Sequence, residues 1–182
     1  MCGEQSYLVD DIVFATGFDA ITGTLIKMDI HGRNGRSIRS EWAGGPRTNA
    51  GLMTAGFPNM FFANGPGSCT GFFNPVMLVE YQGEWLAKLI TTMKRDGVDV
   101  IESDPAADEK WVTHMREVAA PTLFWNSNNW YIGANVPGKP RVMLLYLGGF
   151  GAYREHTTKI AERHYEGFIF SRSSGSAAAK TG

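Results

Sequence analysis

Asp11-Ile12-Val13-Phe14-Ala15-Thr16-Gly17-Phe18-Asp19 is the stretch on which the interpretation of this sequence depends. Its run of β-branched and other apolar residues predicts a strand buried on both faces, as in a parallel sheet covered by helices. Gly17 then permits a sharp turn, and the Asp19 carboxylate can accept hydrogen bonds from backbone N–H groups. Because open α/β sheets bind ligands where such strands end, the stretch is a candidate ligand site. A buried strand followed by an ordinary turn explains these residues equally well.

The composition is that of an ordinary globular protein. The chain has 182 residues and a formal net charge of −1, so neither a nucleic-acid surface nor an acidic tail is indicated. Two cysteines are too few for a disulfide framework, and the four histidines lack the spacing of metal ligands. We see no signal peptide and no apolar run of about 20 residues. We therefore expect a soluble, cytoplasmic protein without a metal site.

Three helices are predicted from capping residues and apolar periodicity. Asn74-Pro75 supplies an N-cap and a favoured first residue for a helix that ends at Lys94-Arg95-Asp96-Gly97. Asp104-Pro105 begins a second helix in the same way, and Pro121 ends it. Residues 152–164 form a third, amphipathic helix.

Other apolar runs predict strands. We expect buried strands at 60–63 and 141–147, a short strand at 166–170, and short alternating strands within 21–30. Asn64-Gly65-Pro66-Gly67-Ser68 follows the first of these, shortly before the helix at Asn74. Free N–H groups in such a turn can bind phosphate or the ring oxygens of a flavin. Because a glycine-rich turn is unspecific, plain packing of helix on sheet is the alternative.

The loop at 121–140 is rich in aromatic residues and amides. Long loops of this kind are often functional. Trp130 could stack on a ring, and Lys139 could contact a phosphate. The aromatic residues could instead only cap the core.

Six motifs follow one another along this chain. They are Ala15–Asp19, Gly44–Thr48, Gly51–Asn59, Gly65–Ser68, Trp130–Pro140 and Tyr165–Phe168. In this order and spacing the set resembles the Baeyer–Villiger monooxygenases, and among them the cyclohexanone monooxygenase type. Each motif alone is unspecific, whereas the set is highly specific.

The resemblance covers only the carboxyl-terminal third of such an enzyme. Members of the family carry two GxGxxG motifs, for FAD and for NADPH, and the fingerprint FxGxxxHxxxW, which this sequence lacks. The implied fold is α/β, a partial FAD/NAD(P)-binding two-dinucleotide-domain fold limited to its C-terminal segment, with added helices and long loops. Residues 1–19 would end the NADPH domain and form the return linker. Residues 20–171 would be the C-terminal part of the FAD domain with the cofactor loop 121–140, and residues 172–182 a disordered tail.

The resemblance also implies roles for single residues. The cofactor-binding residues would be Thr16, Gly17, Asp19, Asn74, Pro75, Trp130 and Lys139. The substrate pocket would be lined by Gly71, Phe72, Phe73 and Met143. Pro75 stands where a methionine beside the flavin is expected, and Gly71 with Phe72 departs from the usual pattern. These departures should reshape the pocket and leave the ketone unidentified.

The implied activity is FAD- and NADPH-dependent insertion of one oxygen atom of O₂ into a ketone C–C bond, which gives an ester or lactone. Because the flavin carries the chemistry, no catalytic side chain is expected from this segment. The segment would work with the missing N-terminal portion, be inactive alone, and involve neither nucleic acid nor membrane. Without strands before Asp11, apolar surface would be uncovered. Two alternatives stay open: a non-catalytic flavin-fold binding module, and a fragment of an N- or S-oxygenating flavin monooxygenase.

Overall fold

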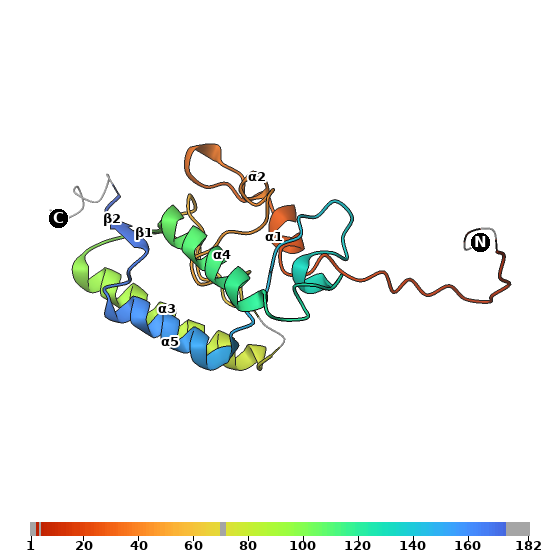
Figure 1. Cartoon of the computed structure of the whole chain (residues 1–182). Coiled ribbons are helices and arrows are strands. Elements are labelled where there is room, and N and C mark those ends of the chain that lie inside the picture. The colour runs from red at the N-terminus through yellow and green to blue at the C-terminus, as the bar shows by residue number, and fades with distance from the viewer. Residues whose placement is uncertain (1–2, 4, 70–71, 174–182) are drawn as a thin grey trace.

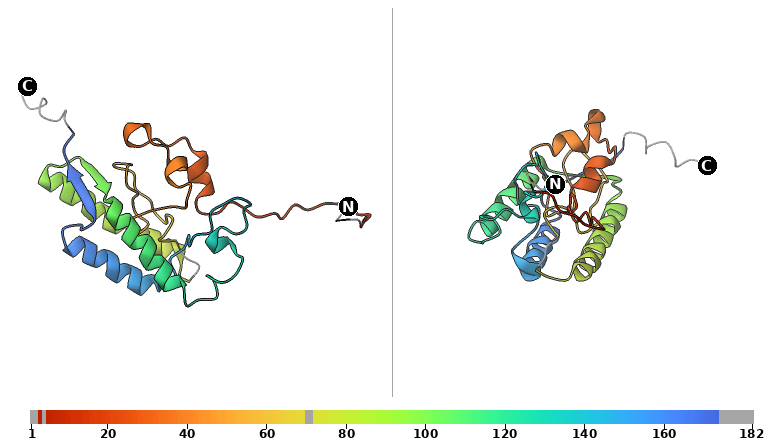
Figure 2. Two further views of the ribbon diagram at one scale, coloured as in Figure 1. Left: turned by 45° about the horizontal axis from the view of Figure 1, so that its top comes forward. Right: turned by 90° about the vertical axis from the view of Figure 1, so that its right-hand side faces the viewer.

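A computed structural model of the chain describes residue 3 and residues 5–69 and 72–173. Its largest elements are α3 (Pro75–Asp96), α4 (Pro105–Ala119) and α5 (Gly149–Glu162), which lie along one another (Figures 1 and 2). At one end of these helices, β1 (Val100–Ser103) pairs antiparallel with β2 (Phe168–Ser171). Irregular chain covers the other side of the helices.

The helix α3 forms where capping and periodicity predict it. The Asn74 side chain accepts a hydrogen bond of 2.9 Å from the N–H of Val76, Pro75 is the first helical residue, and Gly97 ends the helix with a φ of +65°. The buried face carries Leu78, Gln82, Trp85, Leu89 and Met93. This prediction is confirmed.

The predictions of α4 and α5 are also confirmed, with α5 beginning earlier than expected. The Asp104 side chain caps α4 by accepting a hydrogen bond from Ala106 N–H. Tyr153 of α5 joins three segments, because its hydroxyl donates to the Ala50 carbonyl at 2.8 Å and accepts from Gln82 of α3 at 2.7 Å. Trp111 of α4 packs in the same core.

The chain before α3 contains only short elements. They are α1 (Gly23–Lys27), the 3₁₀ turn η1 (Arg33–Gly35) and α2 (Ile38–Glu41). The expected short strands within 21–30 are wrong, because α1 occupies this stretch and its first turn closes locally through Ile26 N–H to Thr22 C=O. A small second core of Ile38, Trp42, Phe57 and Phe62 lies beneath these elements.

The buried strands expected at 60–63 and 141–147 do not form as regular strands. The second segment is nevertheless buried, with Leu144, Leu145 and Tyr146 each 1% exposed. Leu144 N–H donates to the Tyr131 carbonyl, and the Leu144 carbonyl accepts from Gly67 N–H. Its neighbours are a turn at Gly67 and a 3₁₀ turn at Tyr131 rather than strands, so these backbone groups are hydrogen-bonded without a strand ladder. Only the last strand, at β2, matches the expectation for 166–170, and β1 was not predicted.

The strand expected at the opening stretch is likewise absent from the described residues. Residues 11–18 are all exposed, and Val13 and Phe14 are 86% and 83% accessible. The segment extends away from the helices (Figure 1). A strand needs a hydrogen-bonded neighbour, and the described part of the chain supplies none here. None of the described helices is both long and apolar enough to cross a membrane.

Candidate functional site

Two segments named separately as cofactor-binding meet in the structure. The Lys139 ammonium forms an ion pair with the Asp19 carboxylate and donates a 3.2 Å hydrogen bond to the Ala20 carbonyl. The Lys139 side chain is only 10% exposed and that of Asp19 is 30% exposed. The lysine expected to contact phosphate is therefore already paired within the chain.

Asn135 makes a second tie between the same segments. Its amide donates a 2.9 Å hydrogen bond to the Phe18 carbonyl. Next to Phe18, Gly17 has a φ of +83°, and a Cβ placed there would have Asn135 as its nearest neighbour at 4.0 Å. Thr16 and Gly17 are exposed. The backbone at Gly17 is thus open to an approaching group beside the Lys139 loop.

The loop at 121–140 is organised by Asn129 rather than by regular structure. The Asn129 side chain accepts from Tyr131 N–H at 2.8 Å and donates to the Phe124 carbonyl at 2.9 Å, which sets the 3₁₀ turn η2 (Trp130–Ile132). Tyr131 stacks on Phe124 with ring centroids 4.9 Å apart. Trp130 meets Tyr131 only at an edge and is 43% exposed. One aromatic pair caps the core, therefore, while Trp130 is accessible.

The residues before α3 diverge toward different neighbours. Phe72 packs edge-on against Phe124 with centroids 5.3 Å apart, whereas Phe73 packs against Phe150 at 5.4 Å. Asn74 and Pro75 are engaged in starting the helix. Gly71, the remaining residue of the expected pocket, lies outside the described residues. Phe72 and Phe73 thus do not face one common space.

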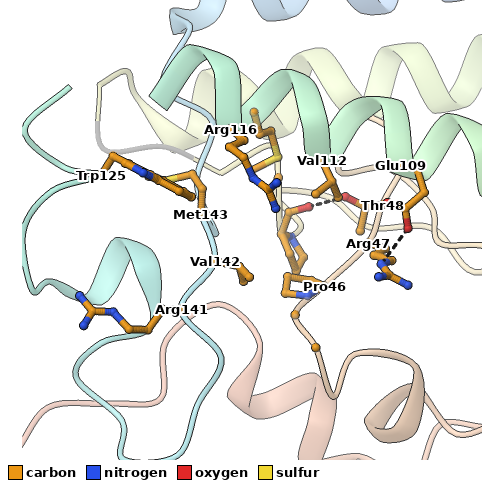
Figure 3. Close-up of a pocket in the computed structure, with 15 residues that line it drawn as sticks. Pro46, Arg47, Thr48, Glu109, Val112, Arg116, Trp125, Arg141, Val142 and Met143 are labelled. Atoms are coloured by element: carbon orange, nitrogen blue, oxygen red, sulfur yellow. Dashed lines mark hydrogen bonds and ion pairs between the residues drawn. The ribbon is translucent and has the colours of Figure 1, made fainter. Parts of the chain in front are cut away.

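The fourth expected pocket residue, Met143, lines a hollow of about 130 Å³ (Figure 3). Its walls are residues 44–48, Pro66 with Gly67, one face of α4, and Trp125 with residues 141–143. A close approach joins two of these walls: a Cβ on Gly45, whose φ is +114°, would lie 2.6 Å from Cγ2 of Val142. Glycine is therefore required where the walls meet.

The glycine-rich turn at 64–68 does not offer the row of free donors that was expected. Asn64 N–H donates to Gln82, Gly67 N–H to the Leu144 carbonyl, and Ser68 N–H to the Gly65 carbonyl. Carbonyls of the turn are used too, since Gly67 accepts from the Trp111 indole at 3.0 Å. The expectation that these three N–H groups are free to bind phosphate is therefore wrong.

Two ionisable groups that sequence reasoning missed are perturbed. Burial raises the pKa of Asp108 to about 6, although its carboxylate accepts from the Ser103 hydroxyl at 2.5 Å and from Ala55 N–H at 2.9 Å. Burial lowers the pKa of His156, whose ring lies nearly parallel to that of His114. In sequence, each looks like a residue of a solvated helix face. The described residues contain no cluster of three metal-ligating side chains.

The curated relatives of this chain are longer proteins, of which it matches one part. It is 42% identical over 164 residues to the acetone monooxygenase (methyl acetate-forming) of Gordonia sp., covering 90% of this chain and 31% of that protein. It is 39% identical to a Baeyer–Villiger monooxygenase of Pseudooceanicola batsensis (93% and 31% covered) and 39% identical to a phenazine N-monooxygenase of Lysobacter antibioticus (88% and 29%). The chain therefore spans about a third of the length of these relatives. No protein-family model matches it.

Solved structures agree with these relatives. Cyclohexanone monooxygenase from Rhodococcus sp. Phi1 bound to NADP⁺ matches with a TM-score of 0.82 and 38% identity, over 88% of this chain and 30% of that one. A complex of OTEMO with FAD and NADP matches with a TM-score of 0.84 and 33% identity, over 92% and 31%. The chain is thus similar in sequence and fold to one segment of Baeyer–Villiger monooxygenases, as the motifs predicted.

Proposed function

We propose that this chain, which is homologous to one segment of the Baeyer–Villiger monooxygenases, is part of an enzyme that inserts one oxygen atom of O₂ into a ketone C–C bond. The product would be an ester or lactone. The observation that carries the proposal is the junction of Asp19 with Lys139, because it joins the two segments expected to contact cofactor. The similarity to ketone monooxygenases supports the same reaction.

The residues at this junction fit a dinucleotide. FAD and NADPH, when bound, would supply the reducing equivalents and the oxygen chemistry. The accessible Trp130 offers a ring for stacking, and the open backbone at Gly17, next to Thr16, allows close approach. Lys139, paired with Asp19, would hold the loop 121–140 against residues 16–20. We propose that this contact positions Trp130 over the nicotinamide cofactor.

The aromatic residues near the start of α3 would bound the ketone pocket. Phe72 with Phe124, and Met143 with Trp125, would present apolar surface and exclude water. Phe73 would support this wall from behind through Phe150. Asn74 and Pro75 would set the helix start beside the flavin, and the role of Gly71 in the pocket stays a prediction from the sequence.

The exposed opening segment supports the need for further protein. Leu8 and Phe18 are 103% and 88% exposed, which leaves a run of apolar side chains in solvent. We propose that residues 1–19 join an NADPH domain, that residues 20–171 complete an FAD domain, and that the N-terminal portion of the enzyme covers the apolar run. A cytoplasmic location, suggested by the low number of cysteines, stays a prediction.

A second reaction has one specific observation in its favour. The relative named a phenazine N-monooxygenase is as similar to this chain as the Baeyer–Villiger monooxygenase of Pseudooceanicola. Oxygenation of nitrogen is therefore the alternative activity. A flavin-fold module without turnover is the alternative of another class.

Complementation tests these proposals. The chain is co-expressed with the part of the Gordonia acetone monooxygenase that it does not match, and NADPH oxidation is followed with ketones, aromatic amines and sulfides. We expect ketone-dependent turnover and an ester product. Lys139→Met should raise KM for NADPH about tenfold, because the charged contact that holds the loop 121–140 against residues 16–20 is lost. Lys88→Met, at an exposed position of α3, is the matched control.

Each outcome has a defined meaning. Turnover by the chain alone would contradict the proposal that it needs the N-terminal portion. N-oxide as the main product would select the alternative reaction. Flavin bound by the complex without any oxygenated product would favour the non-catalytic module.

A further inference from the structure

Arg116 is the feature of the Met143 hollow that neither the motifs nor the proposed function explains. It reaches from α4 into the hollow toward Pro46 (Figure 3). Within residues 5–69 and 72–173 its guanidinium has no carboxylate or carbonyl partner, whereas Arg47 pairs with Glu109 at 2.9 Å. Arg141, the third arginine of the lining, turns away and donates to Asn128.

The charge of this hollow is unbalanced. Three guanidinium groups line it and only one carboxylate, that of Glu109, opposes them. Because Glu109 is already paired with Arg47, the excess of positive charge falls on Arg116 and Arg141. A planar guanidinium offers two parallel N–H donors, which match the two oxygens of a carboxylate.

The remaining wall is apolar and limits the size of a ligand. Trp125, Val142 and Met143 face the hollow opposite Arg116 (Figure 3), and its volume is about 130 Å³. Inorganic phosphate would satisfy the guanidinium but would leave this apolar wall in water. A carboxylate with a short hydrocarbon tail satisfies both sides of the hollow.

We propose that the hollow bounded by Pro46, Arg116 and Met143 binds a small organic carboxylate, with Arg116 as the residue that contacts its oxygens. The tail lies against Trp125 and Val142. The inference shares Trp125 and Met143 with the ketone pocket of the proposed function, but binding of a carboxylate needs neither flavin nor nicotinamide and can be tested apart from that function.

Binding to the full 182-residue chain tests the inference. Butanoate and its neutral analogue butanamide are titrated at constant ionic strength, and Kd is followed by saturation-transfer NMR and Trp fluorescence. We expect butanoate to bind and butanamide to bind at least about fivefold more weakly. Arg116→Gln should weaken butanoate binding about five- to tenfold. Arg39→Gln removes the same charge from an exposed position outside the lining and should change nothing.

A variant that removes a negative charge, and so should strengthen binding, makes the test stricter. Glu109→Gln removes the one carboxylate of the lining and should tighten butanoate binding about two- to threefold. Arg116→Gln and Glu109→Gln both change exposed side chains, and circular dichroism checks that each variant is folded. Equal affinity for acid and amide, an unchanged Kd in Arg116→Gln, or phosphate binding more tightly than butanoate would each overturn the proposal.

Discussion

Asp19 and Lys139 form an ion pair between positions 120 residues apart in the sequence, and the lysine side chain is almost withdrawn from water. The pair closes the loop 121–140 onto the base of the exposed opening segment. The Asp19–Lys139 ion pair therefore helps to set the geometry of the proposed cofactor site. It is therefore a point at which stability and function can be separated by experiment.

Lys139→Met should destabilise the chain measurably. The change keeps most of the side chain's apolar stem but leaves the partly buried Asp19 carboxylate without its partner, so we expect a loss of about 1–2 kcal/mol. Urea unfolding followed by circular dichroism measures it. Lys159→Met breaks the exposed pair with Glu155 on α5 and should cost at most about 0.5 kcal/mol. If Lys139→Met and Lys159→Met lost the same unfolding free energy, burial would add nothing to the strength of the Asp19–Lys139 pair.

Asp108 should make stability fall as pH rises. Its pKa in the folded state is raised to about 6 from an ordinary value of 3.8, so folding favours the protonated carboxyl. The contribution is complete below about pH 4 and is lost as pH increases through about 6. Relative to Asp108→Asn, the free energy of unfolding should drop by roughly 1–3 kcal/mol over this range. Unfolding curves of the wild-type chain and of Asp108→Asn at pH 4 to 7 measure this drop. If the free energy of unfolding depended on pH in the same way in both proteins, the raised pKa of Asp108 would be contradicted.

The exposed apolar run should cause self-association. Val13 and Phe14 are almost fully accessible and belong to a contiguous exposed segment, so a second copy can cover them. Val13→Ser combined with Phe14→Ser should lower the concentration dependence of the sedimentation coefficient. Leu123→Ser changes a single side chain that is also 86% exposed, outside this segment, and is the control. A monomeric wild-type chain at high concentration would refute the expectation.

Gly45→Ala should disrupt the wall of the Met143 hollow. The added methyl would lie 2.6 Å from Val142 at a φ that only glycine adopts readily, which we expect to cost about 2–4 kcal/mol. Adding Val142→Ala should restore part of this loss, because it removes the steric clash while the backbone strain remains. Thermal unfolding of the single and double variants tests the coupling. Additive losses would place the strain elsewhere.

The three long helices α3, α4 and α5 were predictable, unlike α1, because the information for them is local. Asn74 and Asp104 cap α3 and α4 through side-chain contacts two residues away, and the apolar period follows directly. The strands were not predictable, because a strand forms only when a neighbouring strand hydrogen-bonds to it. Residues 141–147 have the pattern of a buried strand, yet the segments beside them, at 67–69 and near Tyr131, are irregular.

Motifs in the sequence suggested members for the candidate site, but not how these residues contact one another. Asp19 and Lys139 were both named, but sequence alone does not reveal that they neutralise each other. Arg116 and Asp108 were missed, because charged residues on a helix usually face water. Asp108 is distinguished from its exposed neighbours by its contact with the loop at 55, whereas Arg116, itself exposed, is distinguished only by its place in the lining of the Met143 hollow.

The antiparallel pairing of β1 with β2 has a consequence for how the chain is made. Residues 167–171 leave the ribosome after everything they contact, including Asn49, whose side chain donates to the Gly167 carbonyl at 2.9 Å. Until then β1, although Asn59 already hydrogen-bonds to Ile101, lacks its partner strand, and the Asn49 amide lacks the Gly167 carbonyl. The part of the core that contains Phe168 is therefore completed only after residues 167–171 have been synthesised, and a chain interrupted before residue 167 would expose the apolar surface that Phe168 covers.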